Sequence, residues 1–258
     1  MDERARYDEW WMAGPGRPCD TCKVGSSVHA ASILLQGPSF YPMHNFGPDR
    51  ASVPVRYLLV AEEPSGAGFG AKLRHGKNPE DSRNFGGTTA GRAGDSALQF
   101  AAREWLCGPN ETFLLTDMAK CAVRDSRHES RERHQYRWQN CAPILQDEAN
   151  RYDLRAIVAV GGKAYAALRD RKWLADRRLF TVMHWAAWPA AQAKVLETAA
   201  DRTLGDETIE GFQAFINERR VLLGKDPKQL KIGRPAKAML AVYREQFRSI
   251  REELSSVA

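Results

Sequence analysis

The chain has 258 residues, 43% of them apolar, which is enough for one large α/β domain with extensions. No apolar run is as long as a membrane span, and the first residues, Met1-Asp2-Glu3-Arg4, carry charges where a signal peptide becomes apolar. We therefore expect a soluble, cytoplasmic protein. Lysine and arginine number 38 against 32 acidic residues, and the resulting net charge of +6 fits either a polyanionic partner or simply a solvated basic surface.

In chain order, the middle of the sequence alternates apolar strands with helical segments. Strands are predicted at 56–61, 112–117, 155–160 and 179–184. Helices are predicted at 92–105, through Ile144 and Ala149 after the charged stretch 124–137, and at 163–168. This order predicts an α/β fold with a doubly wound, four-stranded parallel sheet flanked by helices. Ligands bind outside the carboxyl ends of such strands, which are here Glu62, Asp117, Gly161 and His184.

After the fourth strand the pattern becomes helical, with predicted helices at 190–200, 207–222 and 235–254. Apolar residues of the last helix recur at amphipathic spacing, so we expect it to dock on the body of the protein. We therefore divide the chain into a main domain, 1–200, and a helical C-terminal extension, 201–258, packed on that domain. The basic link 228–235 fits phosphate contacts, although a solvated loop explains it as well.

Cysteines are distributed unevenly along the chain. Cys19 and Cys22 form a C-x2-C pair, Cys107 stands alone, and Cys121 and Cys141 bracket a long polar segment. In a cytoplasmic protein this pattern favours metal binding over disulfides. Structural zinc and an iron–sulfur cluster both accept four thiolates, and spacing does not distinguish them. Ordinary burial is the alternative for Cys121 and Cys141, and it is what we expect for Cys107.

Several short motifs occur in an order that is typical of one enzyme family. They are Cys19-Asp20-Thr21-Cys22; Val60-Ala61-Glu62-Glu63-Pro64-Ser65-Gly66; Phe85 with Ala90-Gly91-Arg92-Ala93-Gly94; Leu115-Thr116-Asp117-Met118-Ala119-Lys120-Cys121; Cys141-Ala142-Pro143 opening a helix; Ile157-Val158-Ala159-Val160-Gly161; and His184. Their order and spacing resemble the iron–sulfur (family-four type) uracil-DNA glycosylases and their wider superfamily, over roughly Cys19 to Pro189.

This resemblance implies that the domain 1–200 is a DNA N-glycosylase that acts on flipped-out bases. It further implies a [4Fe–4S] cluster held by Cys19, Cys22, Cys121 and Cys141. Glu62 is then expected to activate the attacking water and Phe85 to stack on the flipped base, while His184 donates to the O2 atom of the base. Without the shared motif order, Glu62 is more often a cap or surface residue at such a position, and a histidine like His184 is more often a structural donor.

Other residues are candidates for contacts with the base or the DNA strand. The base-binding candidates are Phe85, Asp117, Glu63, Gly86 and Gly87, and the DNA-binding candidates are Trp185, Trp188, Lys120, Arg92 and Arg124. Either tryptophan could fill the gap left by the flipped nucleotide, and core packing is the competing role for both. Acidic residues interrupt the arginines from Arg124 to Arg137, so a solvated helical face is the alternative there.

The most informative departure from the family pattern is Asp117, because the uracil enzymes have asparagine at that position. Cytosine offers an N4 amino donor and an N3 acceptor, the reverse of uracil. A protonated Asp117 accepts from N4 and donates to N3, whereas it lacks the amide donor that uracil O4 needs. A long basic loop, Ser65 to Asn84, and the small residues Gly86-Gly87-Thr88-Thr89 indicate space beside the C5 atom of the base.

The sequence therefore predicts a monomeric enzyme that excises a C5-enlarged cytosine from single- or double-stranded DNA. Within the superfamily this is similar to bacterial anti-phage glycosylases acting on glucosylated hydroxymethylcytosine. One alternative is uracil repair with a tolerated asparagine-to-aspartate change. The other is a cluster-containing DNA-binding module without catalysis, which the missing Pro-Ser after His184 favours.

Overall fold

The computed structural model describes residues 53–62, 93–119, 131–184, 204–222, 226–229 and 231–256. The chain divides into two compact units. The first comprises Met1–Pro42, Val60–Thr88 and Leu115–Asp153, and the second comprises Met43–Leu59, Thr89–Leu114 and Leu154–Ala258. Among the described helices, none is long and apolar enough to cross a membrane. The predicted helix at 190–200 lies outside the described residues, and the predicted boundary at residue 200 stays a prediction.

The predicted parallel sheet of four strands is confirmed. Its strands are β1 (Val55–Ala61), β2 (Thr112–Asp117), β3 (Ala156–Val160) and β4 (Leu179–Val182), in the order β2-β1-β3-β4. Every residue of β2 and β3 is buried, which explains why β3 reads as a continuous apolar run and why β2 has an apolar centre, Phe113 to Leu115. β3 pairs with β4 from Ile157 opposite Leu179 to Val160 opposite Val182. The predicted fourth strand was too long by two residues, because Met183 and His184 follow the end of β4.

In the first unit, the main described helix is α7 (Arg131–Asn150). The prediction that Cys141-Ala142-Pro143 opens this helix is wrong, since all three residues lie well inside it. A proline in a helix interior removes one backbone hydrogen bond and costs about 3 kcal/mol. Here Cys141, Ile144 and Leu145 are buried on either side of Pro143, and burial of this face keeps the helix continuous.

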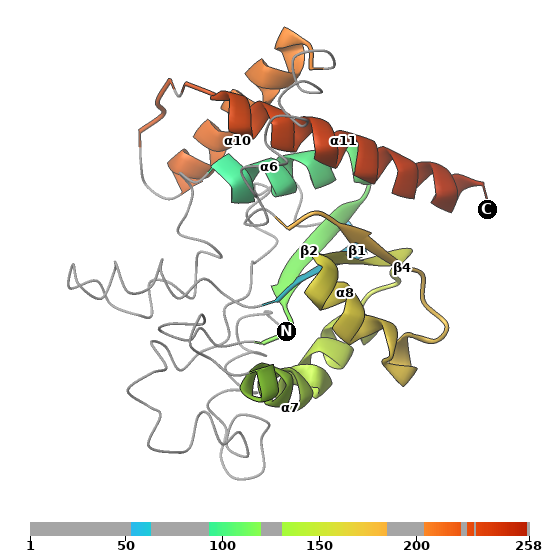
Figure 1. Ribbon diagram of the computed structural model, residues 1–258. Coiled ribbons are helices and arrows are strands. Elements are labelled where there is room, and N and C mark those ends of the chain that lie inside the picture. Colours follow the sequence, from blue (N-terminus) through green and yellow to red (C-terminus); the bar gives the residue numbers. More distant parts are fainter. Residues whose placement is uncertain are drawn as a thin grey trace. The chain divides into compact units, whose positions relative to one another are not determined.

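In the second unit, helix α6 (Ala93–Ala101) continues into a π-helical turn, η3 (Ala102–Leu106), and two further helices pack on it. These are α10 (Asp206–Leu222) and α11 (Arg234–Ser255), which contacts α6, η3 and β4 (Figure 1). Phe100 of α6 packs against Phe212 and Phe215 of α10, with ring centroids 5.4 and 5.8 Å apart. On α11, Tyr243, Phe247 and Leu254 are buried at helical spacing, so one face of this helix packs on the elements it contacts.

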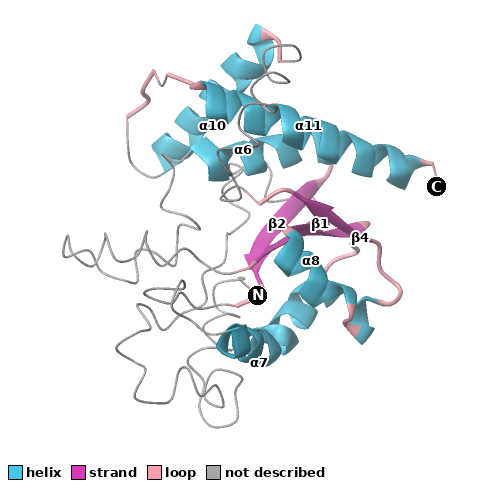
Figure 2. Ribbon diagram, in the orientation of Figure 1, coloured by secondary structure: helices cyan, strands magenta, loops and turns pink. Residues whose placement is uncertain are grey.

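The crossover from β3 to β4 is short and packs directly on both strands. It consists of α8 (Gly162–Arg169) and a single 3₁₀ turn, η5 (Lys172–Leu174), and α8 contacts β3 and β4 (Figure 2). Ala164 and Leu168 are the buried residues of α8. The predicted helix at 163–168 therefore has the right position and is one residue short at each end.

Polar contacts join the beginnings of three strands in the second unit. The Tyr57 hydroxyl donates to Glu111 Oε2 at 3.1 Å, and Arg155 Nη1 donates to Glu111 Oε1 at 2.8 Å. The Gly108 N–H also donates to Glu111 Oε2, at 2.9 Å. Glu111 thus links the residues that enter β2 and β3 to β1. Burial, together with the nearby Glu111 carboxylate, raises the pKa of Tyr57 to about 12.

Candidate active site

In the first unit, Glu62 and Asp117 lie at the carboxyl ends of neighbouring strands. The Met118 N–H donates to the carbonyl of Ala61 at 2.8 Å, and the Ala119 N–H donates to the carbonyl of Glu62 at 3.1 Å. These bonds continue the pairing of β1 and β2 beyond both strands. The sheet therefore brings two of the predicted catalytic residues together, as the prediction from the strand ends required.

Asp117 is completely buried, whereas Glu62 is partly exposed. Next to Asp117, the Thr116 hydroxyl donates to Glu148 Oε1 of α7 at 3.2 Å, and both of these residues are completely buried. Arg137 of α7 is buried to the same degree. The described part of the first unit thus encloses two carboxyl groups and one guanidinium group, an arrangement that needs internal partners because burying isolated charges is costly.

In the second unit, Gly161 and His184 follow the neighbouring strands β3 and β4. The Gly161 N–H donates to the carbonyl of Val182 at 2.8 Å, and the Gly161 carbonyl accepts from the N–H of Tyr165 in α8. Gly161 has φ 99° and ψ 153°, a conformation that is essentially restricted to glycine. A Cβ atom placed on Gly161 would lie 3.0 Å from the Cβ atom of His184, so the backbone of β3 closely approaches this histidine.

Helix α11 holds the peptide that precedes His184. The Met183 N–H donates to Gln246 Oε1 at 3.0 Å, across 63 positions of the sequence. Sequence reasoning missed Gln246, because a partly buried glutamine on an amphipathic helix carries no local signal of this contact. Gly161 was identified from its place at the carboxyl end of β3, but its close approach to His184 was not predicted, although a glycine directly after a buried strand was a usable signal of it.

Most of the other predicted site residues lie outside the described residues. This holds for the predicted ligands Cys19, Cys22 and Cys121, and for Phe85, Glu63, Gly86, Gly87, Lys120, Arg92, Arg124, Trp185 and Trp188. Of the predicted cluster ligands, Cys141 is described; it is 7% exposed and lies on the inner side of α7. Within the described ranges, no group of three or more potential metal ligands occurs.

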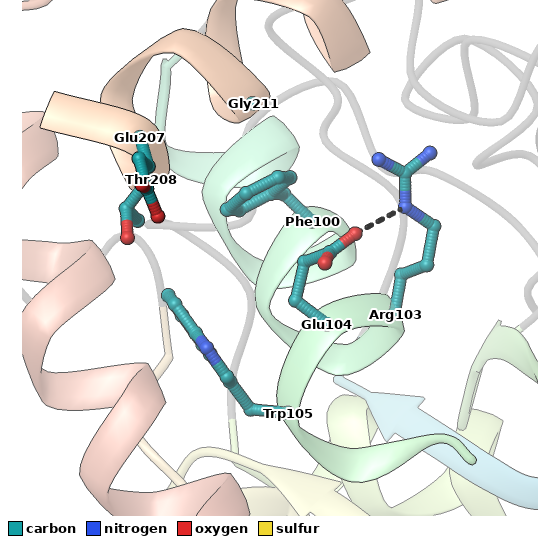
Figure 3. A pocket seen from close by; sticks show the side chains of 7 residues that line it. All are labelled: Phe100, Arg103, Glu104, Trp105, Glu207, Thr208 and Gly211. Carbon is teal, nitrogen blue, oxygen red and sulfur yellow. Dashed lines mark hydrogen bonds and ion pairs between the residues drawn. The ribbon is translucent and has the colours of Figure 1, made fainter. Parts of the chain in front are cut away.

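A shallow cleft of about 200 Å³ lies between η3 and α10 in the second unit. Trp105 extends from η3 toward Glu207 and Thr208, and the Arg103–Glu104 ion pair lies on the other side of Phe100 (Figure 3). Arg103 also pairs with Glu218 and lies 4.6 Å from the ring centroid of Phe215. The cleft is smaller than pockets that enclose small-molecule ligands, which are usually about 300–1,000 Å³. It also lies among helices rather than at strand ends, so it is a poor candidate for a base pocket.

Comparison with known protein families places this chain in a family of known chemistry. The family model described as the uracil DNA glycosylase superfamily matches residues 75–204, half of the chain. The match includes Asp117, Gly161 and His184, while Glu62 and helices α10 and α11 lie outside it. No curated protein matches the chain. Members of this superfamily are DNA N-glycosylases that act on DNA. The chain belongs to the uracil DNA glycosylase superfamily.

Proposed function

We propose that this protein is a DNA glycosylase that removes a cytosine-derived base, enlarged at C5, and leaves an abasic site. The observation that carries this proposal is the position of Asp117. It lies at the end of β2, completely buried, beside β1, which ends at Ala61 just before Glu62. In the motif that this segment resembles, asparagine occupies the position of Asp117 and reads uracil.

The chemistry of the two bases explains why this one residue matters. Uracil presents an acceptor at O4 and a donor at N3, whereas cytosine presents a donor at N4 and an acceptor at N3. A protonated Asp117 matches both groups of cytosine, since it accepts with one oxygen and donates with the other. Complete burial supports a role in reading the base edge, because bulk water does not compete for the carboxyl group. Against uracil, the unpaired O4 costs about 1–3 kcal/mol.

Glu62 and His184 supply the remaining chemistry in this proposal. The carboxylate of Glu62 orients or deprotonates the attacking water and stabilises the positive charge that develops on the sugar. His184, in its neutral form, donates to O2 as negative charge builds on the departing base. Cytosine is a poor leaving group, so the proton that Asp117 delivers to N3 assists bond cleavage. Phe85 stacks on the extracted base.

We further propose that Cys19, Cys22, Cys121 and Cys141 hold a [4Fe–4S] cluster with a structural role. Four cysteine thiolates are a suitable donor set for such a cluster, and Cys141 sits buried on α7. When bound, the cluster ties the N-terminal segment to α7 and to the segment after β2. Hydrolysis of an N-glycosidic bond transfers no electrons, so the protein side chains carry the reaction.

The C5 enlargement rests on the segment from Ser65 to Thr89, which we expect to form a loop and whose sequence has small and basic residues on either side of Phe85. Glucosylated hydroxymethylcytosine is the modified base that we expect to fit best, and its excision from phage DNA would make the protein an antiviral enzyme of the cytoplasm. Excision of such bases would leave abasic sites, which block replication of the phage genome. We expect the enzyme to act as a monomer.

A base panel tests the proposal directly. Purified protein is incubated with otherwise identical DNA containing uracil, cytosine, hydroxymethylcytosine or its glucosylated form, and abasic sites are detected by alkaline cleavage. We expect excision of a modified cytosine and weak or no excision of uracil. Efficient excision of uracil alone would favour ordinary uracil repair, and binding without any excision would favour a DNA-binding module.

The Asp117→Asn variant then tests the carrying residue. It removes the proton donor for N3 and restores the amide that matches uracil, so excision of modified cytosine should fall strongly and some uracil excision should appear. Unaltered base preference would contradict the role of Asp117 and would assign selectivity to the Ser65 to Thr89 loop.

A further inference from the structure

The segment that leads into α11 is held in place by side chains of α10. The Lys228 N–H donates to Asn217 Oδ1, and Gln213 Nε2 donates to the Lys228 carbonyl, both at 2.9 Å. Arg220 Nε donates to the carbonyl of Asp226, also at 2.9 Å. Gln213, Asn217 and Arg220 are spaced by four and three positions, so one face of α10 makes all three bonds. The backbone at 226–228 is therefore fixed, while its side chains are exposed.

Cations recur at every third position along this segment. We call Lys228, Lys231, Arg234 and Lys237 the basic ridge. Lys228, Lys231 and Arg234 are exposed, and Lys237 is half-buried. From Pro227 to Arg244 the sequence contains no aspartate or glutamate, so the charged residues of this stretch are all basic. Positive charge is therefore concentrated in this segment, because the whole chain has a net charge of only +6.

Helix stability does not account for these charges. The first turn of α11 contains no acidic residue, and Arg234 is its first residue. Cations near a helix N-terminus oppose the helix dipole, and each such charge changes stability by about 0.3–1 kcal/mol at exposed positions. Arg234 and Lys237, in the first turn of α11, thus carry a small cost in folding, which favours a role in binding an anion-rich partner.

The direction of α11 places the ridge on the side of the sheet where the strands end. Gln246 accepts from Met183 just after β4, whereas Glu253, seven residues later, accepts from Arg178 just before β4. The helix therefore runs antiparallel to β4, and its first turns extend past the end of this strand, where His184 lies. With a rise of 1.5 Å per residue, Arg234 is about 18 Å along the helix from Gln246.

We propose that the basic ridge binds the phosphate backbone of DNA that extends beyond the nucleotide undergoing excision. This proposal rests on the proposed glycosylase function, since it supplies the DNA-binding surface for that reaction. Lysine and arginine at this spacing neutralise successive phosphates and release their counterions, which gives affinity without base preference. Because the ridge lies outside residues 75–204, it is a contribution of the C-terminal segment of this chain.

Salt-dependent binding tests the ridge without requiring catalysis. Affinity for a short fluorescein-labelled duplex with unmodified bases is measured by anisotropy over a range of salt concentrations. The test variant replaces all four ridge residues with glutamine. The control variant makes the same number of replacements at Arg169, Lys172, Arg248 and Arg251, which are also exposed. Both variants therefore lose the same net charge, and thermal melting checks that each is folded.

We expect the ridge variant to bind the duplex on the order of tenfold more weakly, with a salt slope that falls by about 0.9 for each phosphate that the ridge no longer neutralises. The control should bind like the wild type. On a modified-cytosine substrate, the ridge variant should show a raised KM and an unchanged kcat. An equal decrease in affinity in both variants, or a decrease in neither, would overturn the proposal.

The two proposals can fail separately. Wild-type protein that excises modified cytosine, with both variants binding alike, would reject the ridge and leave the glycosylase function intact. Ridge-dependent binding by a protein that excises no base in the panel would keep the DNA-binding surface and reject the proposed reaction.

Discussion

Gly161 and His184 are close enough that position 161 has room for glycine alone. A Cβ atom on Gly161 would lie 3.0 Å from the Cβ atom of His184, and the φ angle of 99° already excludes other residues without strain. The end of β3 therefore fixes where the histidine backbone lies, independently of whatever its imidazole ring contacts.

We expect Gly161→Ala to damage the site and the fold together. The backbone conformation costs about 1–3 kcal/mol for a residue other than glycine, and the added methyl group pushes against His184. Urea unfolding should show this loss of stability, and single-turnover excision should slow at a temperature where the variant remains folded. Gly162→Ala is the matched control, because a Cβ at Gly162 meets no heavy atom within 4 Å. Because Gly162 is the first residue of α8, this substitution should raise the free energy of unfolding by up to about 1 kcal/mol. Similar losses in both variants would contradict the close approach.

Glu62→Gln preserves the size of the side chain and removes its charge. If Glu62 activates water and stabilises the sugar cation, the single-turnover rate should fall by about 10²–10⁴ while DNA affinity is retained. The rate is measured by quenched-flow or manual sampling with enzyme in excess over DNA. Glu252→Gln, an exposed position on α11, provides a control for loss of one acidic charge. A near-normal rate would show that another residue activates the water.

Cys141 and Cys107 offer a matched pair for the cluster, since they are 7% and 5% exposed. Anaerobically purified protein should be brown and carry about four iron atoms per chain. Cys141→Ser should lose iron and melt at a lower temperature, whereas Cys107→Ser should keep its iron. Metal analysis of both variants gives the answer. Stoichiometric zinc in colourless wild-type protein would reject the iron–sulfur assignment.

Tyr57 gives the fold a dependence on alkaline pH. Its pKa is raised to about 12, chiefly by burial, from the value of 10.0 that we take for the unfolded chain. The native state therefore holds a proton that the unfolded chain releases, so this stabilisation is complete below pH 10 and is lost as the pH rises toward 12. Between these values the free energy of unfolding should fall by about 1.4 kcal/mol per pH unit because of this residue.

Urea unfolding at several pH values compares the wild type with Tyr57→Phe, which lacks the ionising group. At neutral pH the free energy of unfolding of the variant should be lower by about 1.5–3 kcal/mol, because the variant lacks the hydrogen bond to the charged Glu111. Above pH 10 its stability should fall less steeply than that of the wild type. Parallel curves would show that Tyr57 ionises normally in the folded protein.

The sheet was predictable because its signal is local. β1, β2 and β3 are largely buried strands with apolar centres, and their ends identified Glu62, Asp117 and Gly161 without any knowledge of distant contacts. The neighbouring positions of Glu62 and Asp117 then followed from parallel pairing.

The errors have long-range causes. Residues 179–184 read as one strand, but the Met183 N–H turns to Gln246 on α11 instead of extending the ladder. The start of α7 was placed too late because Arg131 to Gln135 are polar and because Pro143 suggested that the helix opens there. The buried face that stabilises the helix despite Pro143 is visible only in the folded chain. The π-helical turn at Ala102–Leu106 was equally hidden, since no local pattern of the sequence distinguishes it from a continuation of α6.

The contacts of α11 at both ends of β4 have a consequence for how the protein opens. Because Arg178 and Met183 are both tied to this helix, amide protons of β4 should not exchange with solvent until α11 detaches. Strand and helix would then form one cooperative exchange unit, although more than fifty residues separate them in the sequence. A fragment that stops at residue 204 would retain His184 directly after a strand that has lost this support.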